Sequence, residues 1–284
     1  MDIIQRLQDE IPSLPKKLAL AARYAIDYPD RIALNSMRSS ANSVGVTSTT
    51  MLRLARQLGF LNYEDFKAGF QSQLVSTGFG ARAGALHQSD DGNEEGTLPE
   101  RILLASQRNL AATLSPRNLA DLPEVARIMR LAPRCHLVGS GAAHVLATLM
   151  KSTGSMILPN LRVVGPEYAV AAEDIGFLSP ADVVIGFGLN PCATRTVEAL
   201  KFSKAQGART VAITDRPSSP LIEHAEFALF ADTVSPHYYP SVGATVALIE
   251  TILATIVAEG GRAEQDRIIA FEKHRKLTDG YVEY

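Results

Sequence analysis

Five short apolar runs, separated by stretches with helical spacing, constrain the fold of the second half of this 284-residue chain. Strands this short and this continuously apolar need cover on both faces, and helical connections between them make neighbouring strands parallel. The pattern therefore predicts an α/β domain with a five-stranded, parallel, doubly wound sheet. The expected strands are Cys135–Val138, Leu161–Val164, Val183–Phe187, Thr210–Ile213 and Phe227–Phe230.

Ligands of doubly wound sheets bind beyond the carboxyl ends of the strands, so the loops that follow the apolar runs are candidate sites. The loop Gly139–Ala142 is glycine-rich and leads into a predicted helix, Val145–Met150, whose N-terminal N–H groups form a natural seat for an anion. His144 stands where the dinucleotide-binding pattern G-x-G-x-x-G requires its last glycine. We therefore expect no nicotinamide dinucleotide, and no other cofactor is predicted.

A different pattern occurs near the N-terminus, in the stretch Val46–Phe60. Its apolar residues Met51, Leu54, Ala55 and Leu58 recur at helical spacing, while the opposite face carries hydroxyls, arginines and no acid. Thr47 or Ser48 is a suitable N-cap, and Gly59 ends the helix. For an isolated helix, a solvated amphipathic surface helix would be the better interpretation.

The preceding residues favour a helix-turn-helix instead. Ser36–Ser43 has the composition of a shorter helix, and Gly45 follows at the tight turn that this motif requires. The second helix of such a motif inserts its N-terminal end into the DNA major groove. We expect Thr49, Thr50 and Arg53 to face base edges. The full set of predicted DNA-contacting residues is Arg38, Ser48, Thr49, Thr50, Arg53, Arg56, Gln57 and Lys67.

The segment from Leu14 to Leu74 resembles the N-terminal domain of the RpiR/MurR family of transcriptional regulators. The resemblance rests on short matches and on the ending L-G-F-x-x-Y-x-x-F-K. It implies an all-α helix-turn-helix domain that binds double-stranded operator DNA. The matching residues are Tyr24-Ala25-Ile26, Tyr28-Pro29, Gly45-Val46-Thr47, Thr50, Arg53, Leu58-Gly59-Phe60 and Tyr63-Glu64-Asp65-Phe66-Lys67.

The segment from about Leu98 to Gly261 resembles the SIS (sugar isomerase) domain, the usual C-terminal partner in that family. The resemblance is carried by P-C-A-T-R-T-V-E-A-L-K, Q-G-A-R-T-V-A-I-T-D and S-P-H-Y-Y-P-S. It implies a small-molecule effector, a sugar phosphate or a related sugar-derived metabolite such as a sugar acid.

The chain departs from the SIS pattern where phosphosugars are usually held. Ala143 stands at a serine position of the first loop, and Leu189 and Pro191 replace residues of the S-x-S-G-x-T loop. Hydroxyls and one arginine remain available, although turn and cap roles explain them equally well. The candidate effector-binding residues are Gly139, Ser140, Gly141, Ala142, Asn190, Thr194, Arg195, Thr196, Thr214, Ser218 and Ser219.

The domain boundaries follow from these patterns. We expect a helix-turn-helix domain at 1–75, a linker at 76–97, the SIS domain at 98–262 and a helical tail at 263–284. Residues 1–80 carry 9 Lys and Arg against 7 Asp and Glu, and the remaining residues carry 19 against 23. Attraction to DNA must therefore come from where the cations are placed rather than from bulk charge.

Composition excludes several other classes. Cys135 and Cys192 do not make a disulfide framework, no metal site is expected, and no apolar run approaches the roughly twenty residues of a membrane span. The N-terminus is too acidic for a signal peptide, which predicts a cytoplasmic protein without membrane contact. The long apolar helix Val242–Val257 and the segment Ile102–Leu114 offer surfaces for a homodimer or homotetramer, although covering the sheet is the competing role.

Two other functions compete with regulation. A phosphosugar isomerase with a helical N-terminal extension would need a general base close to the substrate. A SIS scaffold with neither activity would leave the helix-turn-helix idle. No pairing of candidate bases is evident, so the chain is predicted not to be an enzyme and no catalytic residue is assigned. The candidate bases are His144, Glu167, Glu173, His224 and His237.

Overall fold

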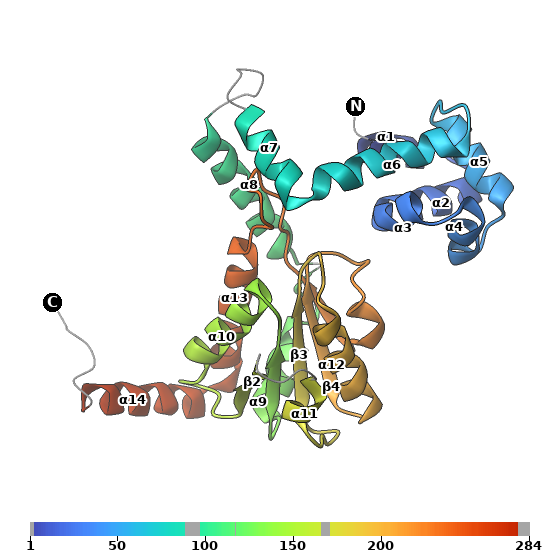
Figure 1. The fold of residues 1–284 in the computed structure, drawn as a ribbon. Helices are drawn as coiled ribbons and strands as arrows, with labels where there is room; N and C mark the ends of the chain where they lie inside the picture. The colour runs from blue at the N-terminus through green and yellow to red at the C-terminus, as the bar shows by residue number, and fades with distance from the viewer. Residues whose placement is uncertain (1–2, 89–96, 117, 166–170, 278–284) are drawn as a thin grey trace. The chain divides into compact units, whose positions relative to one another are not determined.

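The computed structural model describes residues 3–88, 97–116, 118–165 and 171–277 (Figure 1). The chain divides into two compact units. Residues 1–95 together with 236–239 form the N-terminal unit, and residues 96–235 together with 240–284 form the C-terminal unit.

The N-terminal unit is helical, as predicted. Its apolar core includes Met51, Phe66 and Phe70, and the rings of Phe66 and Phe70 meet edge to face with centroids 5.0 Å apart. The elements are α1 (Ile3–Glu10), η1 (Ile11–Ser13), α2 (Lys16–Asp27), α3 (Pro29–Leu34), α4 (Met37–Val44), α5 (Ser48–Gln57), α6 (Tyr63–Thr77) and α7 (Phe79–Gln88).

Two of these helices were not expected. The sequence predicts a helix from Lys16 to Tyr28 that Pro29 stops, and α2 does end there. Pro29 also opens α3, because proline suits the first position of a helix where its missing N–H is not needed. Residues 79–88, predicted to lack regular structure within the linker 76–97, form α7. Gly80 and Gly84 each weaken a helix by about 1 kcal/mol relative to alanine, so local propensity does not predict this helix. The rest of that predicted linker, residues 89–96, lies outside the described residues.

The C-terminal unit contains the predicted five-stranded sheet. Every strand pair is parallel and the strand order is β2-β1-β3-β4-β5. The fold class predicted from the apolar runs is therefore confirmed. The strands are β1 (Cys135–Val138), β2 (Leu161–Val163), β3 (Val183–Gly188), β4 (Arg209–Thr214) and β5 (Phe227–Phe230).

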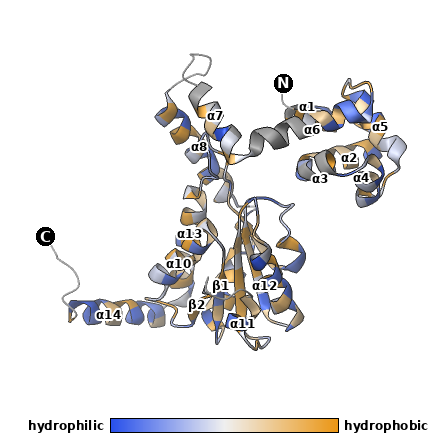
Figure 2. Ribbon diagram, in the orientation of Figure 1, coloured by the Kyte–Doolittle hydropathy of each residue, from blue (hydrophilic) through white to orange (hydrophobic). Residues whose placement is uncertain are grey.

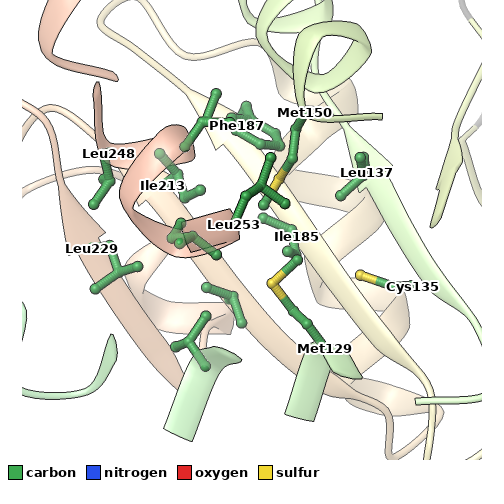
Figure 3. Packing of buried hydrophobic residues seen from close by; sticks show 14 of the residues in the cluster. Met129, Cys135, Leu137, Met150, Ile185, Phe187, Ile213, Leu229, Leu248 and Leu253 are labelled. Carbon is green, nitrogen blue, oxygen red and sulfur yellow. The ribbon is translucent and has the colours of Figure 1, made fainter. Parts of the chain in front are cut away.

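Successive strand side chains point to opposite sides of this sheet, so a continuously apolar strand makes both faces apolar. Helices cover both faces. Leu137, Ile185 and Ile213 point to one side and join the core formed with α9, α10 and α13 (Figure 3). Val184 and Ala212 point to the other side, toward α11 and α12. Figure 2 shows the hydrophobic colour along the strands. The helices are α8 (Leu98–Thr113), α9 (Leu122–Leu131), α10 (Ala142–Gly154), α11 (Ala171–Ile175), α12 (Thr194–Ala205), η3 (Ile222–His224), α13 (Gly243–Gly260) and α14 (Arg262–Lys276).

The spacing of apolar residues predicts a helix over Asn118–Leu131, but α9 starts only at Leu122, and Asn118 explains the difference. Its amide donates to the carbonyls of Thr113 and Phe230, both at 2.6 Å, and its carbonyl accepts from the N–H of Phe230 at 2.8 Å. The side chain thus pairs with the outer edge of β5, where unpaired backbone groups would otherwise face solvent. Residues 118–121 form turns rather than the predicted helix.

α13 corrects one expectation about membranes. Among the described residues it is the one helix long and apolar enough, by length and composition alone, to cross a membrane. Its apolar composition has a role inside the unit, because one side of the helix is buried against the sheet core. The buried residues are Ala244, Thr245, Leu248, Ile249, Ile252, Leu253 and Ile256.

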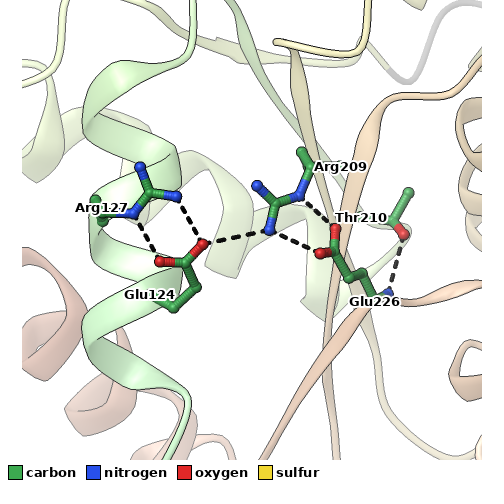
Figure 4. A network of polar contacts seen from close by, with 5 residues as sticks. All are labelled: Glu124, Arg127, Arg209, Thr210 and Glu226. Carbon is green, nitrogen blue, oxygen red and sulfur yellow. Dashed lines mark hydrogen bonds and ion pairs between the residues drawn. The ribbon is translucent and has the colours of Figure 1, made fainter.

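Charged side chains link elements at the amino ends of the strands (Figure 4). Glu124 of α9 accepts two hydrogen bonds of 2.7 Å from Arg127 and a contact of 3.4 Å from Arg209. Hydrogen bonds from Arg127 lower the pKa of Glu124 to about 2. Arg209 also holds Glu226, which follows in the chain just before β5. This surface network ties α9, β4 and β5 together.

Asp182 makes a more deeply buried ion pair at the same edge. Its side chain is fully buried and accepts from Arg134 Nε at 3.0 Å and Nη2 at 2.7 Å. Ser179 adds its N–H at 2.7 Å and its hydroxyl at 2.9 Å. Burial opposes ionisation of Asp182, but the hydrogen bonds from Arg134 and Ser179 outweigh it and lower the pKa to about 2. The pair joins the residues that precede β1 and β3.

We expect Asp182→Asn to lower the free energy of unfolding by about 3 kcal/mol at pH 7, because Arg134 loses its buried counter-charge. The folded-state pKa is depressed, so this stabilisation is present above the unfolded pKa of about 4 and is lost as pH falls toward 2. Urea titrations at several pH values measure it. Glu124→Gln, which removes an exposed pair, serves as the control and should cost much less. Equal losses for the two variants, or a difference independent of pH between 2 and 7, would contradict this role.

Candidate DNA-binding and effector sites

The predicted helix-turn-helix is formed by α4 and α5. Gly45 ends α4 in the left-handed region with φ 75°, where a residue with a side chain would be strained. The N–H of Gly45 donates to Asn42 at 3.1 Å and that of Val46 to Ala41 at 3.0 Å. These two bonds satisfy the last carbonyls of α4 and reverse the chain direction. Val46 packs against the apolar core and fixes the turn to the unit.

Local sequence determines how α5 is oriented. Thr47 caps it by accepting from the N–H of Thr50 at 3.2 Å. Met51, Leu54 and Ala55 are completely buried, so the opposite side of the helix faces solvent. The amphipathic pattern in the sequence therefore corresponds to a helix that packs one face against the core of the N-terminal unit.

The solvent-facing side of α5 carries Thr49, Arg53 and Arg56, which follow one another at i, i+4 and i+7. Within the described part of the chain no hydrogen bond or ion pair engages either guanidinium. The first turn of α5 also contains no acidic residue. These three side chains form an exposed face, here called the α5 face, on which a hydroxyl and two cations are available to a ligand.

The other predicted DNA-contacting residues lie around this face to different degrees. Arg38 on α4 and Gln57 at the end of α5 are exposed, whereas Ser48 and Lys67 are half-buried. The hydroxyl of Thr50 lies 3.0 Å from that of Thr47, so it takes part in the cap. The geometry thus favours Thr49 over Thr50 as the accessible hydroxyl.

The second candidate site is at the carboxyl edge of the sheet. In the order β2-β1-β3-β4-β5 the chain leaves β1 toward one edge and β3 toward the other. The loops after these two adjacent strands therefore separate and leave a crevice, which is where doubly wound sheets bind ligands. Both loops lead directly into helices, α10 and α12.

The loop after β1 brings backbone close to backbone. A Cβ atom on Gly139 would lie 2.5 Å from the carbonyl oxygen of Ala143, so only glycine fits. Gly141 has φ 58° and precedes α10, whose N-terminus has no side-chain cap. Ser140 is half-buried and Gly141 is exposed. The N–H groups of Ala143 and His144 donate to the carbonyls of Ser140 and Gly141, at 3.2 and 3.0 Å, so of the first three helical residues Ala142 offers its N–H to a ligand or to water.

The sequence predicts a loop over Gly188–Thr196 after β3, but this loop is shorter, because Thr194, Arg195 and Thr196 form the first turn of α12. This helix also begins without a side-chain cap. Thr194 is exposed, but the guanidinium of Arg195 donates to the carbonyl of Gly165. The predicted anion partner is therefore turned toward the end of β2.

Two predicted ligand hydroxyls are inaccessible in this structure. Thr196 and Thr214 are completely buried, and neither hydroxyl has a hydrogen-bond partner among the described residues. Ser219 is also buried and accepts from the N–H of Leu221 at 3.4 Å. Accessible polar groups at the crevice come instead from Ser140, Asn190, Thr194 and Ser218, the first and last being half-buried.

Sequence reasoning missed Asp215, the residue after β4. Its carboxylate is 3% exposed, pairs with Arg216 at 3.1 Å and accepts from the N–H of Asn190 at 3.3 Å. It thereby connects the loops after β3 and β4. Burial first, and Asp215 second, raise the pKa of the half-buried Cys192 thiol to about 11. Asp215 directly follows β4, and the loop after this strand already supplied candidate residues. Its place at the strand end is the signal that could have identified it.

The candidates for an isomerase base lie on separate elements. His144 is half-buried in α10, Glu173 is exposed on α11, and His224 is half-buried in η3. His237 is exposed, and Glu167 lies outside the described residues. The described segments hold no group of three or more His, Cys, Asp or Glu side chains that could bind a metal ion.

Comparison with known proteins agrees with this architecture. A SIS-domain family model matches residues 128–258. An uncharacterised HTH-type transcriptional regulator of Haemophilus influenzae is 23% identical over 228 residues, which cover 80% of this chain and 79% of that protein.

Two solved structures share the fold. The NanR protein of Vibrio vulnificus, solved in complex with ManNAc-6P, aligns with a TM-score of 0.60 and 15% identity over 98% of this chain and all of that one. The sugar isomerase domain of an RpiR transcription factor from Sphaerobacter thermophilus aligns with a TM-score of 0.57 and 22% identity over 64% of this chain and 99% of that one. Residues 128–258 therefore form a SIS domain that follows an N-terminal helical unit, and the chain shares the fold of these two solved structures.

Proposed function

We propose that the protein is a DNA-binding transcriptional regulator whose SIS domain senses a sugar phosphate or a related sugar-derived metabolite. The observation that carries the proposal is the α5 face, where Thr49, Arg53 and Arg56 are exposed on the second helix of a helix-turn-helix. Arginine binds the guanine edge in the major groove with two hydrogen bonds, and short hydroxyls serve either bases or phosphates. HTH-type regulators among the relatives support this assignment. The proposal places the protein in the cytoplasm, where its operator DNA would be.

A single helix-turn-helix reads too few base pairs to select one site in a genome, so we propose that the protein acts as a homodimer or homotetramer. α8 offers a surface for pairing, because several large apolar side chains on this 16-residue helix are exposed. Isolated exposed leucines are common, whereas a row of them on one helix is typical of an interaction surface. The exposed residues on α8 are Leu98, Ile102, Leu103, Leu104 and Leu110, and exposed Leu114 follows directly after the helix.

The effector is proposed to bind at the crevice between the loops after β1 and β3. The uncapped N-termini of α10 and α12 both lie there and favour a negatively charged group. Ser140 and Thr194 add accessible hydroxyls. Ala143 and Leu189 are apolar and mostly buried, so this chain has fewer hydroxyl donors than a SIS phosphosugar site. Sugar acids therefore stand beside sugar phosphates as proposed effectors.

Catalysis is not part of the proposal. An isomerase needs a general base within hydrogen-bond reach of the substrate carbon's proton. His144, Glu173 and His224 belong to three different elements, and no observation in the described residues favours the isomerase reading.

We expect Arg53→Ala to lower affinity for DNA from upstream of the protein's own gene by about 1–3 kcal/mol and to relax sequence preference. Arg56→Ala should weaken binding to that DNA and to random DNA alike, if it contacts phosphate. Fluorescence anisotropy with both DNAs at several salt concentrations measures the two effects. Arg108→Ala, on α8 of the C-terminal unit, is the charge-matched control. Parent-like binding of both DNAs by Arg53→Ala would show that the α5 face is not the recognition surface.

A thermal-shift screen of sugar phosphates, including ManNAc-6P, and of sugar acids should identify a stabilising compound. Binding of that compound should weaken by about tenfold or more, equal to about 1.4 kcal/mol, in Ser140→Trp, because the indole would occupy the crevice. Ser152→Trp places the same bulk on an exposed position of α10, the helix that follows this loop, and this variant should bind the compound normally. Unchanged affinity in Ser140→Trp would place the binding site elsewhere.

A further inference from the structure

The segment that follows β5 is anchored to the carboxyl end of β4, and the next residue of that strand end, Asp215, binds the loop after β3. The N–H of Ala231 donates to the carbonyl of Thr214 at 2.8 Å, so the ladder between β4 and β5 continues past the strand end. The N–H of Asp232 donates to the hydroxyl of Thr113 at 2.9 Å, and the carbonyl of Val234 accepts from Asn109 at 2.8 Å. Both partners belong to α8. This end of the segment is fixed to the C-terminal unit.

The segment then forms a closed loop. The N–H of Ser241 donates to the carbonyl of Thr233 at 3.1 Å, which brings the two ends of the loop together. Pro240 is buried at the returning end, just before α13. Movement of the β4–β5 end would therefore be transmitted to the loop rather than absorbed by a slack connection.

The tip of this loop belongs to the N-terminal unit. Residues 236–239 group with residues 1–95, although they lie far along the chain. The Tyr239 ring packs on Phe79, the first residue of α7, with ring centroids 5.0 Å apart. The N–H of Tyr239 donates to His237 Nδ1 at 3.1 Å, a hydrogen bond within the tip itself. α7 in turn follows directly on α6, which packs against α5.

We propose that the loop 233–241 carries the coupling between the effector crevice and the DNA-binding helices, with Tyr239 as its contact residue. The inference rests on the proposed function. A ligand changes DNA affinity only if it binds one arrangement better than another. This loop has its base in the ladder at Thr214 and its tip on α7. Coupling is reciprocal, so DNA bound to α5 must also change the loop and the crevice.

Adjacent tyrosines provide a matched pair of variants. Tyr239 is half-buried and packs on Phe79, whereas Tyr238 is 47% exposed and stacks on His237 within its own loop. Tyr239→Ala removes the contact with α7, and Tyr238→Ala removes a ring of the same size one position earlier. Both positions lie outside the core clusters of the two units.

Hydrogen–deuterium exchange of the full chain, with and without DNA from upstream of its own gene, tests the inference. In the parent, DNA should alter exchange in residues 188–193 and 231–241 by about fivefold or more, the lower end of typical coupling. Tyr239→Ala should bind the DNA within about threefold of the parent, yet show no DNA-dependent change in those two segments. Tyr238→Ala should behave as the parent does.

The possible failures are distinguishable. A parent protein that binds no DNA would overturn the proposed function and the coupling with it. DNA binding by the parent with no change in residues 188–193 and 231–241 would overturn the coupling alone. The coupling would also be overturned if Tyr239→Ala kept the full DNA-dependent change. Equal effects of the two tyrosine variants would show that the loop conformation, rather than the Phe79 contact, is responsible, and would refute the role given to Tyr239.

Discussion

Burial of both faces of one parallel sheet is the constraint on which the C-terminal unit depends. Leu137, Ile185 and Ile213 require cover on one side, and Val184 and Ala212 require it on the other. Parallel strands also need crossovers, and the crossover helices supply that cover. Every strand must then end at the same edge of the sheet. The candidate effector crevice is therefore a consequence of how the core is buried, and its chemistry depends on the loops alone.

In the N-terminal unit the corresponding constraint is local. Gly45 sets the turn, and Met51, Leu54 and Ala55 direct one side of α5 into the core. Arg53 and Arg56 are left on the opposite side, although residues 1–80 are nearly balanced in charge. Counterion release depends on the cations that meet phosphates, not on net charge. A near-neutral domain with a positively charged exposed face is thus consistent with binding DNA.

Much of this fold could be predicted from periodicity. The five apolar runs predicted the strands to within one residue at each end, and the stripe from Met51 to Leu58 predicted α5. Features set by tertiary contacts could not be predicted. Asn118 leaves the expected helix to pair with β5, and α7 forms where Gly80 and Gly84 argued against a helix. The strand order of the sheet shows which loops lie next to one another, and spacing along the sequence does not give that order.

The effector crevice was the least predictable part, because exposure depends on packing. Hydroxyls at strand ends were all candidates from sequence, yet Thr196 and Thr214 are buried and Arg195 is held by Gly165. Asp215 joins two loops by accepting a hydrogen bond from the N–H of Asn190, which lies 25 residues earlier in the chain. The departures from the SIS pattern were visible from the start, and they remain the reason why the effector is proposed only as a sugar-derived anion.

The central claim is that α5 reads DNA from a symmetric assembly of this chain. Hydroxyl-radical footprinting on the DNA upstream of its own gene tests this claim most directly. The account predicts two protected half-sites whose centres lie about 10 base pairs, or a multiple of that, apart. Contradictory results would be no protection at concentrations that retard the DNA in a gel, or continuous protection without paired half-sites.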